Sequence, residues 1–67
     1  MTTGTVKWFN PAKGFGFIEP ADGGADVFAH YAYITAGGPL DLQQGQRVSF
    51  SLIHGKKGPH AENILPA

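Results

Sequence analysis

The fold is decided by one short stretch of sequence, Lys13-Gly14-Phe15-Gly16-Phe17-Ile18. A β-strand turns alternate side chains to the same face, so Phe15 and Phe17 share one face. Gly16 keeps the opposite face small, and Ile18 follows on that face. This strand is therefore predicted to have two unlike apolar faces, one of flat rings and one aliphatic.

A second stretch, Val27-Phe28-Ala29-His30-Tyr31, repeats the pattern. Phe28 and His30 share one face, whereas Val27 and Ala29 point the other way. A small domain has a single core, and the aliphatic face is the better candidate because it carries no charge to desolvate. The rings, accompanied by Lys13 and His30, would then be exposed as a platform for stacking nucleobases. The alternative, in which the rings form the core, would turn Gly16 and Ile18 toward water.

Length and composition place the chain in a broad class. Its 67 residues predict one domain, 1–67, of modest stability, because so small a domain buries only about 60% of its unfolded surface. With no cysteine, it has neither disulfides nor cysteine-ligated zinc, which fits a reducing cytosol. The start lacks the features of a signal peptide, and no apolar run approaches the ~18 residues of a membrane span. We therefore expect a soluble, cytoplasmic protein.

The net charge of zero weighs against nucleic-acid binding, because neutralising phosphates normally requires a basic surface. The distribution of the cations weakens this objection. Lys7 and Lys13 flank the aromatic stretches, and Lys56 and Lys57 share one loop bounded by glycines. A protein that binds by stacking needs fewer cations than one that binds by clamping phosphates.

Turn signals divide the chain into short strands and loops, with one helical turn near Tyr31–Ile34. A long loop is expected over 35–44 and a hairpin loop over His54–Pro59. Five strands without a long helix favour a closed barrel, because closure removes exposed strand edges. The predicted strands are Thr5–Phe9, Phe15–Glu19, Asp26–His30, Arg47–Ile53 and Ala61–Leu65.

Over essentially its whole length the sequence resembles the cold-shock domain of bacterial cold-shock proteins. Five segments carry the resemblance: Gly4–Asn10, Lys13–Ile18, Val27–Tyr31, Gly45–Phe50 and Gly58–Ile64. It implies an all-β fold, a five-stranded antiparallel OB-fold barrel. It also implies a non-enzymatic, monomeric binder of single-stranded RNA and DNA, with a preference for pyrimidine-rich strands. Members of this family are regarded as RNA chaperones and as regulators of transcription or translation.

The resemblance also assigns roles by position. Asp26 would form a hydrogen bond with a base, although it could instead hydrogen-bond the turn before its strand. Because Lys7 and Trp8 are neighbours, simple alternation cannot place both on the binding face, and a bulge or strong twist is needed. The residues expected to stack on bases or contact their edges are Trp8, Phe15, Phe17, Phe28, His30 and Tyr31. Those expected to contact phosphates or other polar groups are Lys7, Lys13 and Lys57.

The chain departs from the family pattern at several positions. Pro39 stands where the family usually has Phe or Tyr, and Leu40 where a basic or polar residue follows. Tyr31 ends the second motif in place of Phe and keeps the ring. Tyr33 replaces a residue that is usually small, and whether it substitutes for the missing loop ring stays open.

Other functions find less support. Three scattered histidines without cysteine or a paired carboxylate predict no metal site, and no cofactor is expected. The dispersed carboxylates predict no enzyme. The loop at Gly55–Gly58 lacks the strand-to-helix context of a P-loop. An RNA recognition motif would need two helices and a longer chain. The best rival is a peptide-binding module of the SH3 type, which also has an aromatic groove.

Overall fold

The computed structural model describes residues 2–34 and 42–67. Each of the five predicted strands is present, and most of them are longer than predicted. The predicted helical turn is a 3-10 helix, η1, at Tyr31–Tyr33. The strands are β1 (Thr2–Asn10), β2 (Phe15–Pro20), β3 (Val27–His30), β4 (Arg47–Gly55) and β5 (Gly58–Pro66).

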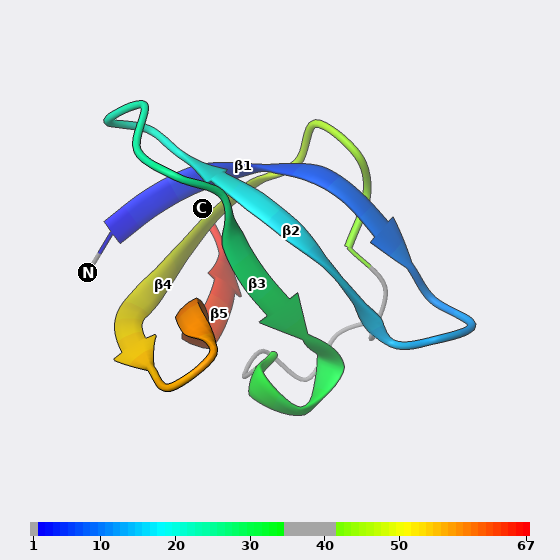
Figure 1. Cartoon of the computed structure of the whole chain (residues 1–67). Coiled ribbons are helices and arrows are strands. Elements are labelled where there is room, and N and C mark those ends of the chain that lie inside the picture. The colour runs from blue at the N-terminus through cyan, green and yellow to red at the C-terminus, as the bar shows by residue number, and fades with distance from the viewer. Residues whose placement is uncertain (1, 35–41) are drawn as a thin grey trace.

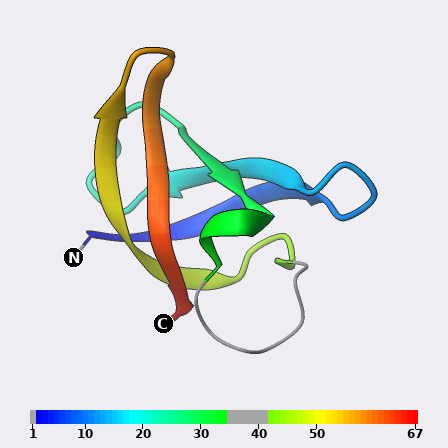
Figure 2. The same cartoon turned by 90° about the horizontal axis from the view of Figure 1, so that it is seen from below.

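The strands close into a barrel in the order β1-β2-β3-β5-β4 (Figure 1). Figure 2 shows that the long β4–β5 hairpin runs crosswise to β1 and β2. Each strand pair is antiparallel except β3 with β5, which is parallel and joins Phe28 to His60. The predicted antiparallel barrel is thus correct apart from the pair that closes it.

The core is the aliphatic side of the strands, as predicted. Ile18 is fully buried, and Val27 and Ala29 are each 1% exposed. Within the described residues no polar or charged side chain is buried, so burial of apolar area holds the barrel together without internal ion pairs. The buried apolar residues are Val6, Ile18, Val27, Ala29, Leu42, Val48, Phe50, Ala61 and Ile64.

Gly16 lets β1 and β2 approach closely behind the aromatic stretch. A Cβ atom at this position would lie 2.2 Å from the backbone oxygen of Trp8 and 2.7 Å from the Cα atom of Phe9. Both are backbone atoms, so neither can move aside cheaply. Gly16 was predicted to keep the face opposite the rings small. In the structure this is where the backbones of β1 and β2 come into close contact.

The predicted hairpin loop His54–Pro59 is wrong in its extent. Gly55 pairs with Gly58, so only Lys56 and Lys57 lie between β4 and β5. Gly58 has a φ of 114°, a conformation that glycine adopts without strain and that allows so tight a connection. Because the strands extend to the turn, His60 becomes a strand residue that faces β3.

Candidate nucleic-acid interface

The aromatic side chains of β1, β2 and β3 gather into one continuous surface. The ring of Trp8 lies 5.9 Å from that of Phe15 and 5.4 Å from that of Phe17, between centroids. Phe28 lies 5.8 Å and 5.7 Å from the same two phenylalanines. The register explains this grouping, because Phe17 pairs with Trp8 on one side and with Phe28 on the other.

The surface continues past β3 into η1. Phe28 lies 6.3 Å from His30, and His30 lies 4.6 Å from Tyr31, again between ring centroids. Trp8 and Tyr31, near its two ends, are 44% and 47% exposed, so these rings are not core residues. We call this surface the aromatic platform, and its members are Trp8, Phe15, Phe17, Phe28, His30 and Tyr31.

A bulge in β1 allows Lys7 and Trp8 to face solvent together. Val6 pairs with Ile18 and Trp8 pairs with Phe17, which leaves Lys7 without a Cα partner in this ladder. Val6 is buried, whereas Lys7 and Trp8 are both exposed. A bulge or strong twist was needed to bring both Lys7 and Trp8 to the binding face. The bulge between Val6 and Trp8 meets this need.

The His30 ring is held by the backbone of the turn that follows it. Its Nδ1 atom accepts a hydrogen bond from the backbone N–H of Ala32 at 3.2 Å. The backbone N–H of Tyr31 donates to the carbonyl oxygen of Gly14 at 2.9 Å, which fastens η1 to the start of β2. These contacts fix the end of the aromatic platform before any ligand arrives.

The predicted polar residues surround the platform, but two of them contact each other. The Nζ atom of Lys7 lies 3.1 Å from a carboxylate oxygen of Asp26. From the sequence, Asp26 was expected to form a hydrogen bond with a base or with the turn before its strand. This ion pair with Lys7 was not predicted. Lys13 is exposed in the turn that ends at β2, and Lys57 lies at the tip of the β4–β5 hairpin.

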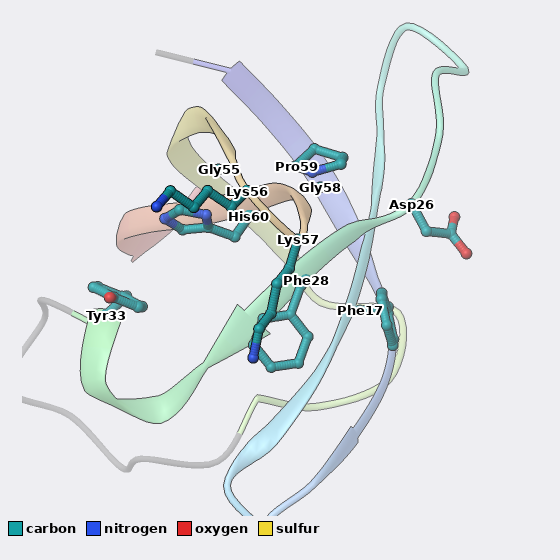
Figure 3. Close-up of a pocket in the computed structure, with 10 residues that line it drawn as sticks. All are labelled: Phe17, Asp26, Phe28, Tyr33, Gly55, Lys56, Lys57, Gly58, Pro59 and His60. Carbon is teal, nitrogen blue, oxygen red and sulfur yellow. The ribbon is translucent and has the colours of Figure 1, made fainter.

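An open cleft of about 570 Å³ borders the platform between β3 and the tip of the β4–β5 hairpin. Phe17 and Phe28 line it from the platform, and Asp26 lies at the same end as Phe17 (Figure 3). The hairpin residues from Gly55 to His60 line its other side, and Tyr33 comes in from η1. Lys57 is thus brought to the same site as two of the platform rings.

The family model that describes the 'Cold-shock' DNA-binding domain matches residues 2–67. The chain belongs to the cold-shock domain family. This family consists of non-enzymatic nucleic-acid binders, and the prediction that the chain is not an enzyme is confirmed on that ground. The platform just described is therefore the surface of a cold-shock domain.

Full-length relatives support the same assignment. The chain is 61% identical to the cold shock protein ScoF of Streptomyces coelicolor over 67 residues, all of both chains. It is 56% identical to the cold shock-like protein CspD of Escherichia coli, covering 98% of this chain and 89% of that protein. The fold is also that of the Drosophila Unr CSD456 structure, with a TM-score of 0.81 at 21% identity, over 98% of this chain and 26% of that one.

His60 is a cleft residue of this cold-shock domain that the sequence did not single out. It lies between the predicted hairpin loop and the predicted strand Ala61–Leu65, yet it pairs with Phe28 across the parallel contact and lines the cleft. The pairing joins residues far apart in the chain, so no local pattern could have indicated it. Lys56, next to the predicted Lys57, lines the cleft as well.

Two further findings concern the described part of the chain alone. No group of three metal-binding side chains occurs within residues 2–34 and 42–67. Over the same residues, no helix has the length and apolar character required to cross a membrane.

Pro39 and Leu40, at which the sequence departs from the family pattern, lie outside the described residues.

Proposed function

We propose that this cold-shock domain binds single-stranded RNA and DNA by stacking successive bases on the aromatic platform. The observation that carries the proposal is the separation of the two strand faces. Ile18 is fully buried, while neighbouring rings on the other face, such as Trp8, stay nearly half exposed. A contiguous patch of exposed aromatic rings marks a binding site, and the flat faces of nucleobases fit such rings.

The surrounding charges suit the backbone of such a ligand. Lys7, Lys13 and Lys57 would contact phosphates on either side of the stacked bases, and Asp26 would accept a hydrogen bond from the edge of a base. Stacking provides affinity without reading a sequence, because every base has a flat face. A duplex offers no free faces, so it is a poor ligand.

The cellular role follows from this preference for unpaired strands. By holding bases on its rings, the domain would keep transcripts unpaired and so act as an RNA chaperone that affects transcription or translation. We place this activity in the cytoplasm and assign it to the monomer. Pyrimidine-rich strands should bind best, because they stack weakly on themselves and are flexible.

Trp8 provides a direct reporter, because its exposed ring belongs to the platform and lies next to the rings of Phe15 and Phe17. We expect oligothymidine to quench Trp8 emission, whereas a duplex of the same length should have little effect. A proline-rich peptide tests the rival peptide-binding function and should leave the emission unchanged. A response to the peptide alone would reject the proposed function.

A further inference from the structure

A second pair of rings lies in the cleft beyond the aromatic platform. Tyr33 in η1 and His60 in β5 lie 5.7 Å apart between ring centroids, with their planes tilted by 35°. Tyr33 is 42% exposed, and its ring is one of those that line the cleft. A large exposed ring next to a second ring is the same arrangement that marks the platform itself.

The His60 ring is held in place by its neighbours. Its Nε2 atom lies 2.8 Å from a carboxylate oxygen of Glu62, and an ionised carboxylate can only accept, so this nitrogen carries the hydrogen. Below the ring, a Cβ atom on Gly55 would lie 3.1 Å from Nδ1 and 3.2 Å from Cε1. Glycine at this position therefore leaves room for the His60 ring next to β4.

Tyr33 is likewise attached to the barrel. Its neighbour Ile34 forms a parallel bridge with Ile64 of β5, and the backbone N–H of Ile34 donates to Tyr31 at 3.1 Å. The backbone that carries Tyr33 is therefore attached to β5 before a ligand binds, which lowers the entropy that a stacked base would have to overcome.

The pair is continuous with the proposed binding surface. His60 is the Cα partner of Phe28, and the same cleft is lined by Phe17, Phe28 and Tyr33 (Figure 3). Lys56 and Lys57 also line this cleft, so positive charge lies in the same cleft as the two rings. Rings and cations together match a nucleotide better than an apolar ligand.

We propose that Tyr33 and His60 form an additional subsite that stacks the base of one further nucleotide of a bound single strand. The proposal rests on the proposed function, since the strand must first lie on the aromatic platform. The two rings are already in contact, so the base stacks on the exposed face of the pair and is not inserted between the rings. Lys56 contacts the phosphate of that nucleotide.

The test compares oligothymidines of about 4 to about 10 nucleotides, within the range of site sizes of OB folds. In the unmodified protein, affinity should rise with oligomer length. One step in this rise should occur at the length at which the oligomer first reaches the Tyr33 subsite. Tyr33→Ala should bind the short oligomers normally but bind the long ones about five- to tenfold more weakly, the low end of what one stacked base contributes. Tyr33→Phe should restore the step, because it keeps the ring.

Phe17→Ala is the control that separates this inference from the proposed function. It should weaken binding at every length. If Phe17→Ala weakens binding but Tyr33→Ala matches the unmodified protein at all lengths, the subsite does not exist while the platform stands. If Tyr33→Ala weakens all lengths equally, it acts on the platform through η1, and the separate subsite is again rejected. If even the unmodified protein fails to bind, the proposed function itself falls.

A second measurement needs no variant and is decisive even where Tyr33→Ala fails to fold. The ring protons of Tyr33 and His60 are followed by NMR as oligothymidine is added to the unmodified protein. Long oligomers should shift both sets of resonances upfield by ring-current effects, while short ones shift only those of the platform. Resonances of Tyr33 and His60 that stay in place with the long oligomer would overturn the proposal.

Discussion

The Nζ atom of Lys7 lies 3.1 Å from the Oδ2 atom of Asp26, so two residues proposed to contact nucleic acid are partners in the free protein. Their side chains are 49% and 39% exposed. An ion pair this accessible contributes less than about 1 kcal/mol to stability, and it can open when a phosphate offers a competing anion. The pair therefore holds Lys7 beside the aromatic platform without blocking it.

Removing Lys7 should affect binding more than folding. Lys7→Ala should change the free energy of unfolding by less than about 1 kcal/mol, because only an exposed pair is lost. The slope of log K against log[salt] for oligothymidine should become less steep by about 0.7, the share of one phosphate on a single strand. Asp26→Ala is the matched control for the ion pair, and it should leave this slope essentially unchanged. An unaltered slope in Lys7→Ala would show that Lys7 does not reach a phosphate.

Binding should depend only weakly on salt in the unmodified protein. With two or three cations that contact phosphates, the slope of log K against log[salt] should be about −1.4 to −2.1. The titration can be followed through Trp8 emission at several salt concentrations. A slope several times steeper, or tighter binding of a duplex, would contradict a mechanism based on stacking.

Gly16→Ala should destabilise the fold, because the new Cβ atom would lie 2.2 Å from the backbone oxygen of Trp8. We expect a loss of about 1–3 kcal/mol in the free energy of unfolding, as for an overpacked site, measured by urea denaturation. Gly24→Ala is the control, since its Cβ atom would meet only the exposed Asp22 side chain, at 3.1 Å. It should shift stability by no more than about 0.5 kcal/mol. Equal effects of the two substitutions would show that β1 and β2 are not in close contact at Gly16.

The sequence predicted those features that depend on local pattern. Alternation assigned Ile18 to the core and Phe17 to the opposite face, and the structure confirms that Ile18 is buried while Phe17 is only partly covered. The conflict between Lys7 and Trp8 required an irregularity in β1, and the register shift between Val6 and Trp8 is that irregularity. Such features are set by neighbours along one strand or within one hairpin.

The features that sequence reasoning missed depend on contacts between distant segments. The parallel pairing of Phe28 with His60 closes the barrel and brings His60 into the cleft, but nothing in either strand's own pattern specifies it. The ion pair between Lys7 and Asp26 likewise joins a residue within β1 to one just before β3. The extent of the β4–β5 hairpin was underestimated because Gly55 and Gly58 were interpreted as loop residues, although they are paired.

The central claim is that adjacent residues of β2 serve opposite purposes, and a comparison of Phe17→Ala with Ile18→Ala tests it most directly. Phe17→Ala should stay folded and lose about 1–3 kcal/mol of oligothymidine binding, the contribution of one stacked base. Ile18→Ala should lose about 2–5 kcal/mol of folding stability, because Ile18 is fully buried in the core. Urea denaturation and Trp8 titration of both variants give the two free energies. If Phe17→Ala unfolds as readily as Ile18→Ala, the aromatic face is part of the core and the proposed function is wrong.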